Sequence, residues 1–422
     1  MSDLKKLYFY NVLVSASLTV ISDFIFIDLL LLRIGTGVAL VGAIKALIFF
    51  LPVVSYQLAA PLLNKWRCEV PLCAWCYLLR TLLPMLIPAA AVLGAGNAAL
   101  RWMCAVLLPT GLMLATFANN ALMIIYHREF PADGFNRCSG IVHMCFYLPG
   151  LALGFPVSMW LSHAAKLPDA KFFAAYLAAG ALCGAFQLPA FAIMRTLKSG
   201  AAAGSGAVPE KAAGGMLVPY RDRESRGTLL VTFLHALAIG GGTAYIGVFC
   251  LKILQASVST TFVLRTAAAG AGALLMPFAG KLADRFGYRR VFVCGGLLMM
   301  AGVGAPAAFP HLWVLPLCAL LFWDGAVSPV GAAMQMCEQA AASKLASDRD
   351  TAGYIAAFNV ARMSGMGLGS LLSGALVALF RRLGSTEETG LRLVFAACLA
   401  LLLPMIVAAV RLFPARKEKV TT

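Results

Sequence analysis

Charged residues are scarce in this chain of 422 residues, since Asp, Glu, Lys and Arg make up 12% of it, whereas about 25% is usual in soluble domains. So few charges cannot cover the surface of a soluble protein of this size. Histidine is also scarce, with five residues and no H-E-x-x-H or similar spacing. No nucleophile–base spacing or phosphate-binding loop is present either. The composition excludes a soluble enzyme, and we expect no catalytic activity, no metal site and no bound cofactor.

Apolar sequence is abundant instead, at 61% of the residues. A helix needs about 20 apolar residues to span a membrane, and polar or Gly/Pro positions divide this chain into runs of about that length. The predicted spans are 8–32, 37–62, 70–94, 99–125, 138–162, 171–195, 227–251, 259–280, 290–309, 312–338, 351–380 and 391–413. The sequence therefore predicts an all-α polytopic membrane protein with twelve transmembrane helices and the lipid bilayer as its main partner.

A polar stretch rich in Gly and Ala, residues 196–226, separates the first six spans from the last six. Its composition is typical of a flexible linker. We expect an N-terminal six-helix bundle at 1–195, a cytoplasmic linker at 196–226 and a C-terminal six-helix bundle at 227–422. The linker is too short to hold a soluble output domain, which makes a membrane sensor the weaker interpretation.

Basic residues set the expected orientation. The net charge is +16, and with the N-terminus inside, 22 of the 34 Lys and Arg lie on cytoplasmic segments and 8 on external ones. This asymmetry follows the positive-inside rule. We expect a multi-pass protein of the cell (inner) membrane with both termini in the cytoplasm. The positive charge is explained by topology, so we expect no nucleic-acid partner. We also expect the protein to be a monomer.

A charged motif follows the eighth span, in the sequence GKLADRFGYRR. Its key residues are Gly280, Asp284, Arg285, Gly287, Arg289 and Arg290. This pattern and its position resemble the signature of the major facilitator superfamily (MFS) of transporters. The resemblance implies two pseudo-symmetric six-helix bundles around a midplane cavity that opens to each side of the membrane in turn.

The motif also predicts contacts on the cytoplasmic side. By pseudo-symmetry, Asp284 is expected to face the start of the fifth span near Arg137, and Arg285 to reach Glu338. A carboxylate is favourable at a helix N-terminus, and the Arg fork suits a carboxylate. These contacts would hold the cytoplasmic side shut. The alternative is that the motif residues only anchor a tight turn at the headgroups.

A second resemblance covers the first three spans. Ser22–Asp23, Thr36–Gly37–Val38–Ala39, Phe50–Leu51–Pro52 and Arg80 occupy places typical of the macrolide-type and enterobactin-type exporters within the superfamily. The loop after the second span, APLLNKWR, is a degraded copy of the charged motif. This resemblance implies export of an amphipathic organic compound.

Ionisable residues inside a membrane are costly and indicate function or pairing. Asp23 and Lys45 are predicted at similar depth, and Arg80 lies deep in the third span. Asp23 is the expected proton carrier, with a structural ion pair to Lys45 or Arg80 as the alternative. Asp28, five residues before Arg33, is expected to form an interfacial pair.

In the second half, Asp324 and Arg362 are expected to pair, with substrate contact as the alternative. Polar and aromatic side chains of the spans are candidates for the substrate cavity, although they could equally join helices. They are Asn119, Asn120, Tyr245, Trp323 and Asn359. Gly240–Gly241–Gly242 is either a gating segment or a site of close helix packing.

These observations predict a secondary transporter driven by a proton gradient. The first interpretation is proton-coupled efflux of a drug-like or siderophore-like small molecule. The alternative is a symporter that imports an anionic organic metabolite with protons, because Lys45, Arg80, Arg265 and Arg362 are four cations within the spans.

Overall fold

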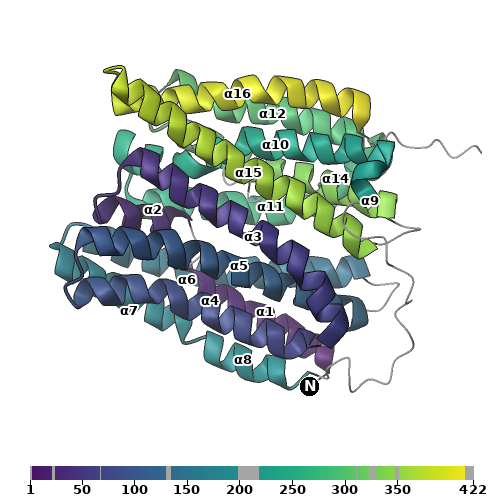
Figure 1. The fold of residues 1–422 in the computed structure, drawn as a ribbon, viewed down its shortest axis with the longest axis horizontal. Helices are drawn as coiled ribbons and strands as arrows, with labels where there is room; N and C mark the ends of the chain where they lie inside the picture. Colours follow the sequence, from purple (N-terminus) through teal and green to yellow (C-terminus); the bar gives the residue numbers. More distant parts are fainter. Residues whose placement is uncertain are drawn as a thin grey trace, which may run out of the picture. The chain divides into compact units, whose positions relative to one another are not determined.

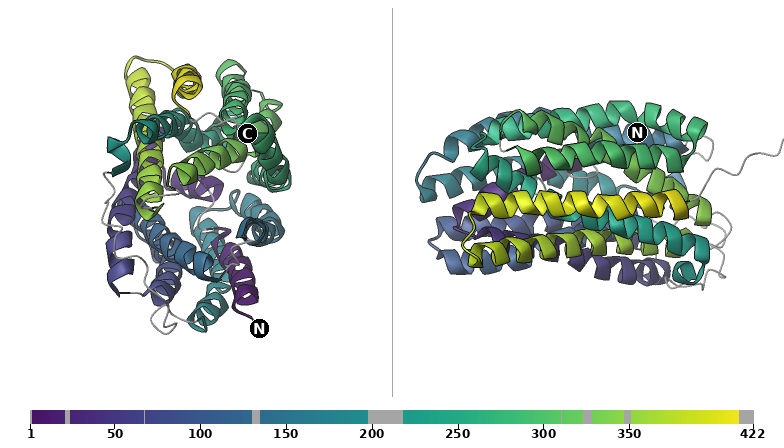
Figure 2. Two further views of the ribbon diagram at one scale, coloured as in Figure 1. Left: turned by 90° about the vertical axis from the view of Figure 1, so that its right-hand side faces the viewer. Right: turned by 90° about the horizontal axis from the view of Figure 1, so that it is seen from above.

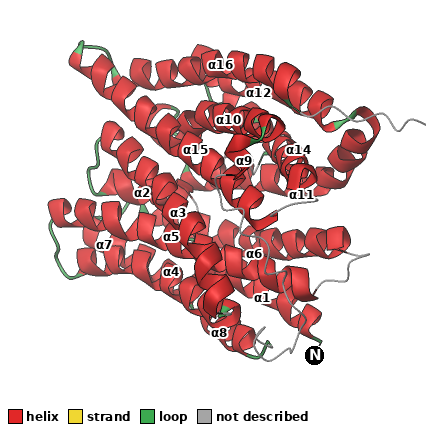
Figure 3. Cartoon of the chain, turned by 45° about the vertical axis from the view of Figure 1, so that its right-hand side comes forward, coloured by secondary structure: helices red, strands yellow, loops and turns green. Residues whose placement is uncertain are grey.

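The computed structural model describes residues 2–20, 24–66, 68–129, 135–197, 218–309, 311–322, 328–346 and 351–413. These residues form helices and short connections, with no strand among them (Figure 3). Helices suit long apolar runs because they satisfy every backbone hydrogen bond within the segment, which a bilayer interior requires. The prediction of an all-α fold is confirmed.

The described residues of the first part of the chain contain eight helices. They are α1 (Asp3–Leu18), α2 (Phe24–Arg33), α3 (Val38–Trp66), α4 (Glu69–Val92), α5 (Asn97–Glu129), α6 (Phe135–Ala164), α7 (Asp169–Gly184) and α8 (Gln187–Arg195). The second part contains α9 (Val218–Arg221), α10 (Arg223–Val248), the π-helical turn η3 (Phe249–Ile253), α11 (Val258–Phe286), α12 (Tyr288–Ala308), α13 (Val314–Leu321), α14 (Pro329–Ala346), α15 (Thr351–Arg382) and α16 (Glu387–Leu412).

Within the described residues, eight segments are long and apolar enough to cross a membrane. They are Val38–Leu58, Glu69–Val92, Asn97–Leu122, Asp169–Arg195, Ser225–Ile253, Tyr288–Ala308, Ala356–Arg382 and Glu387–Leu412. Each coincides with a predicted span. The other four predicted spans fall on α1 and α2, on α6, on α11, and on α13 and α14.

Three predicted spans consist of two helices each. In the span 171–195, α7 ends at Gly184 and α8 begins at Gln187. In the span 8–32, α1 ends at Leu18 and α2 begins at Phe24. In the span 312–338, α13 ends at Leu321 and α14 begins at Pro329. At the start of α14, the Ser328 hydroxyl accepts a hydrogen bond from the backbone N–H of Gly331, and proline at the first helical position has no N–H to satisfy.

The described chain forms two compact units. Unit 1 contains residues 1–207 and 250–266, and unit 2 contains residues 208–249 and 267–422. The sequence assigned 227–422 to one bundle, whereas η3 and the first turns of α11 pack in unit 1. Figure 1 shows α4, α5 and α7 of unit 1 in blue shades, and α10, α12, α15 and α16 of unit 2 in teal to yellow.

The core of unit 1 gathers around α1, which contacts α6 and α8. Tyr10 is fully buried and meets Tyr77 of α4 edge-to-face, with ring centroids 6.1 Å apart. Tyr126 of α5 donates a hydrogen bond to Asn11 Oδ1 at 2.9 Å, and Asn11 Nδ2 donates to Leu7 O. Polar groups of this core are therefore paired between helices, as a protein interior requires.

Unit 2 is built around α10, which packs against α15 and α16; Figure 2 shows these helices running alongside one another. The contact with α15 depends on glycine, because a Cβ on Gly240 would lie 2.5 Å from Met366 O and one on Gly365 would lie 2.6 Å from Phe233 O. Ser370 Oγ donates to Gly240 O at 3.0 Å. The helix continues unbroken through Gly240–Gly241–Gly242, so this structure shows the close-packing alternative.

We expect Gly365→Ala to lower the free energy of unfolding by about 1–3 kcal/mol, because the new methyl group would press on backbone atoms that cannot move aside. The matched control is Gly304→Ala in α12, where the nearest atom to a new Cβ is Leu399 Cδ2 at 3.7 Å. This control should be neutral or slightly stabilising, since Ala favours helix over Gly. Thermal unfolding in detergent measures both, and equal melting temperatures would contradict the tight α10–α15 contact.

Candidate functional site

A buried ion pair joins α2 and α3 in unit 1. Lys45 Nζ lies 2.6 Å from Asp28 Oδ1, and both side chains have 0% exposed surface. The ammonium group also lies 5.2 Å from the ring centroid of Phe24, whose ring is tilted against Phe49 at 5.8 Å. A lysine and an aspartate sealed from solvent are stable only together, because each would be an uncompensated buried charge without the other.

The described partner of Lys45 is Asp28. The expected pairing of Lys45 with Asp23 stays a prediction, because Asp23 lies outside the described residues.

The prediction of an interfacial pair between Asp28 and Arg33 was wrong, since Arg33 Nε binds Asp169 at 2.7 Å. Residues five apart on a helix point about 140° away from each other. Asp28 therefore faces α3 while Arg33 reaches the α6–α7 connection, where it donates to Ala165 O at 3.1 Å.

Arg80 is half-buried in α4, and its guanidinium lies 5.8 Å from the centroid of the Tyr77 ring. Tyr77 donates a hydrogen bond to Asn119 Oδ1 of α5. Asn119 therefore joins α4 to α5, which is the helix-joining role weighed for it, and its neighbour Asn120 is half-buried. The predicted contact of Arg80 with Asp23 lies outside the described residues and stays a prediction.

A second buried pair, in unit 2, joins α10 to α14. His235 Nδ1 lies 2.8 Å from Glu338 Oε1, with side chains 5% and 1% exposed. The imidazole edge faces Phe292 at 5.5 Å, and His235 Nε2 is buried without a hydrogen-bond partner among the described residues. His235 lies about 18 Å along α10 from Arg223, at about 1.5 Å per residue.

This pair corrects the expectation that Arg285 reaches Glu338. Glu338 lies on the side of α14 that packs against α10 and meets His235 there, whereas Arg285 is exposed at the end of α11, 5.3 Å from the Phe286 ring centroid. Sequence reasoning missed His235 because it searched histidines only for metal-binding spacing. The usable signal was an ionisable residue within an apolar span.

The remaining predicted residues of unit 2 are separated. Arg362 Nη2 donates to Gln335 Oε1 of α14 at 3.0 Å, and its predicted partner Asp324 lies outside the described residues, as does Trp323. Tyr245 is fully buried in α10 and presents no surface to a solute in this structure. Asn359 is half-buried on α15.

The charged motif forms the connection between α11 and α12. Gly287 adopts φ +87°, a backbone conformation that L side chains rarely adopt, and this one residue separates the two helices. Arg289 Nε donates to Phe413 O at 2.8 Å and so holds the end of α16, while Arg290 is exposed. The motif therefore forms the turn between α11 and α12.

The predicted gate contacts of Asp284 and Arg137 stay predictions, because their side chains lie outside the described ones, and Gly280 lies within α11. Within the part of the chain that the structure describes, no group of three or more His, Cys, Asp or Glu residues is placed to hold a metal ion. The buried polar centres of both units therefore consist of ion pairs and hydrogen bonds.

Comparison with known proteins shows what the fold is similar to. Residues 228–422 match the family model of the Major Facilitator Superfamily, and no curated protein sequence matches the chain. The chain is similar in structure to a D-xylose–proton symporter, with a TM-score of 0.68 and 16% identity over 98% of each chain. It is also similar to a variant of the nucleoside transporter NupG, with a TM-score of 0.67 and 12% identity over 98% of this chain and 99% of that one.

A bacterial homolog of the human lysosomal transporter Spinster, inward-facing and unoccupied, matches with a TM-score of 0.64 and 16% identity over 97% of this chain and 96% of that one. The chain thus has the all-α fold of these transporters. The match to the family model covers residues 228–422, just under half of the chain. The comparisons give no support to the macrolide and enterobactin exporter branch, and identities of 12–16% carry the fold and not the substrate.

We expect Lys45→Met to lower the free energy of unfolding by about 3–5 kcal/mol, because Asp28 would remain as a buried charge without its partner. The double variant Asp28→Leu/Lys45→Met should recover most of this loss. The control is Glu388→Gln, which removes an exposed pair with Arg392 and should cost about 1 kcal/mol or less. Thermal unfolding in detergent measures all three, and a Lys45→Met variant as stable as the control would refute the sealed pair.

Proposed function

We propose that this chain is a secondary transporter that couples the movement of a small organic solute to the movement of protons across the cell (inner) membrane, with both termini in the cytoplasm. A multi-helix fold shared with solute transporters supports transport. The positive-inside distribution of Lys and Arg supports the orientation. The proton gradient is the proposed driving force, and the protein works without a resident cofactor.

The observation that carries proton coupling is the pair of His235 and Glu338. Histidine commonly acts as a proton carrier in proteins. Here it is sealed among apolar helices, directly against a carboxylate, and its other ring nitrogen has no described partner. A proton that arrives or leaves changes the charge of a buried pair, which biases the packing of α10 against α14.

Asp23 remains a proposed second proton carrier. Five residues further on, Asp28 is neutralised by Lys45 inside unit 1, so the two aspartates of this segment would have different roles. Asp28 holds α2 against α3 as part of an ion pair. Asp23 would load and release the proton.

Export of an amphipathic organic compound in exchange for protons is the first form of the proposal, resting on the pattern of the first three spans. Uptake with protons is the second, favoured by the structural similarity to a protein named as a D-xylose–proton symporter. The two forms differ in the direction of solute movement under the same pH gradient, so one flux assay distinguishes them.

The test uses the full-length protein in liposomes with an imposed pH gradient, after a thermal-shift screen that includes D-xylose, nucleosides and amphipathic dyes. We expect the gradient to drive transport of a hit from the screen. His235→Gln and Glu338→Gln should abolish gradient-driven accumulation but retain solute exchange at equal pH, because exchange needs no net proton movement. Asp23→Asn should behave in the same way if it also carries a proton.

His311→Gln is the matched control, because His311 is an exposed histidine before α13, and it should behave as the unmodified protein. Full accumulation by both the His235 and Glu338 variants would show that the proton uses another path. Solute exchange without any response to the pH gradient would overturn proton coupling and leave facilitated diffusion.

A further inference from the structure

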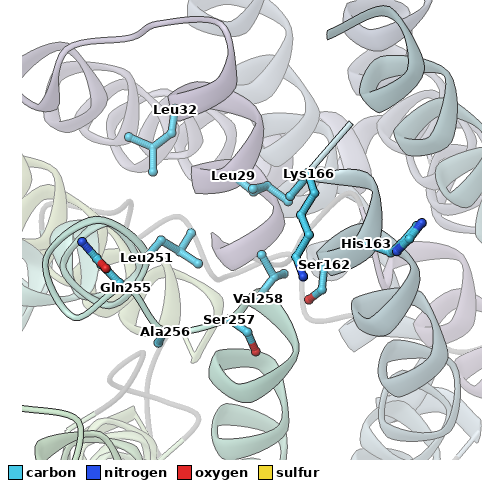
Figure 4. A pocket seen from close by; sticks show the side chains of 11 residues that line it. Leu29, Leu32, Ser162, His163, Lys166, Leu251, Gln255, Ala256, Ser257 and Val258 are labelled. Carbon is cyan, nitrogen blue, oxygen red and sulfur yellow. The ribbon is translucent and has the colours of Figure 1, made fainter. Parts of the chain in front are cut away.

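A cavity of about 550 Å³ lies in unit 1. One wall is α2, another is the end of α6 with the loop that follows it, and the third is the segment 251–258 that connects η3 to α11 (Figure 4). This volume falls within the range of about 300–1,000 Å³ typical of small-molecule sites.

The polar part of the lining is positive. Lys166 extends across the space beside Ser162 and Val258 (Figure 4), and His163 also belongs to the lining. The described residues that line the cavity include no Asp or Glu. A lysine ammonium group with adjacent hydroxyl groups is a donor set suited to a phosphate or carboxylate.

Two serines extend this donor set. Ser162 Oγ accepts the backbone N–H of Ser259 at 2.8 Å, which leaves its own hydroxyl proton to donate. Ser257 Oγ accepts the backbone N–H of Thr260 at 2.9 Å and caps the start of α11. The positive end of that helix therefore lies at the cavity, which adds to the attraction of an anion.

The remaining lining is apolar, with Leu29 and Leu32 on α2 facing Leu251 and Val258. A ligand that fills this space needs an apolar body as well as a negative head. An inorganic anion alone would leave these leucines without contact, and burial of apolar surface contributes about 25 cal/mol per Å².

The backbone of the third wall is also unusual. Gln255, which lines the cavity, has φ +51° although it is not glycine, and it follows the π-helical turn η3. The Ala256 N–H bonds to Cys250 O at 3.0 Å across this turn. Strained residues and π-helical turns concentrate at ligand sites, where surrounding structure maintains them.

We propose that this cavity is a binding site for an amphipathic anion. Lys166, with the hydroxyl groups of Ser162 and Ser257, holds the phosphate or carboxylate head, and Leu29, Leu32 and Val258 contact the apolar part. The proposal concerns binding, so it is tested by binding alone and not by transport. An anionic membrane lipid and a soluble organic anion share this chemistry.

The test measures binding by calorimetry on the full-length protein in phosphatidylcholine nanodiscs, with octyl phosphate and octanoate as soluble probes. We expect at least one probe to bind, and Lys166→Gln to weaken that binding roughly tenfold or more, since a hydrogen bond to a charged group is lost. The control Lys171→Gln removes an exposed lysine at the start of α7, outside the cavity, and should bind as the unmodified protein does. Leu32→Trp, which fills the cavity, should also weaken binding.

Competition by phosphatidylglycerol in the nanodisc would identify a lipid as the natural source of the anion, and binding without competition would identify a soluble compound; both support the site. Three results would overturn it: no binding of either probe or of phosphatidylglycerol, equal losses in Lys166→Gln and Lys171→Gln, or binding of inorganic phosphate as strong as that of octyl phosphate. None of these results depends on transport, so the proposed function is judged separately.

Discussion

A charge inside a bundle of apolar helices must have a partner, and this constraint organises the interior of both units. In unit 1, Lys45 meets Asp28 with no solvent contact, and in unit 2 His235 meets Glu338. Water would screen such pairs at a surface and leave them little influence on structure. In the interior the same pairs determine which faces of two helices meet, because any other register would leave a buried charge unpaired.

The uncharged part of the interior depends on the close approach of helix backbones. In unit 2, Gly240 and Gly365 let the backbones of α10 and α15 come together, and the Ser370 hydroxyl bridges them. In lipid the hydrophobic effect does not drive helices together, so close packing and interhelical hydrogen bonds stabilise their association instead.

The proposed anion site depends instead on the polar groups at helix ends. Spanning segments must end in polar groups, so Lys166, Ser162 and Ser257 gather where α6 ends and α11 begins. Segment 250–266 follows the linker in sequence yet packs in unit 1. A bound anion there would hold that segment in place, so the site is well placed to influence the helices on either side of it.

The apolar runs that form the described spanning helices and the charged turn after the eighth run could be read from the sequence, because hydropathy and turn chemistry are local properties. Eight runs have their spanning helix within the described residues, and Gly287 turns the chain as its motif suggested. The pairing of Lys45 with Asp28, and of Glu338 with His235 in place of Arg285, was decided by the tertiary structure alone. Pairing depends on which helix faces meet, and that is decided by packing between segments far apart in the chain, which no local pattern records.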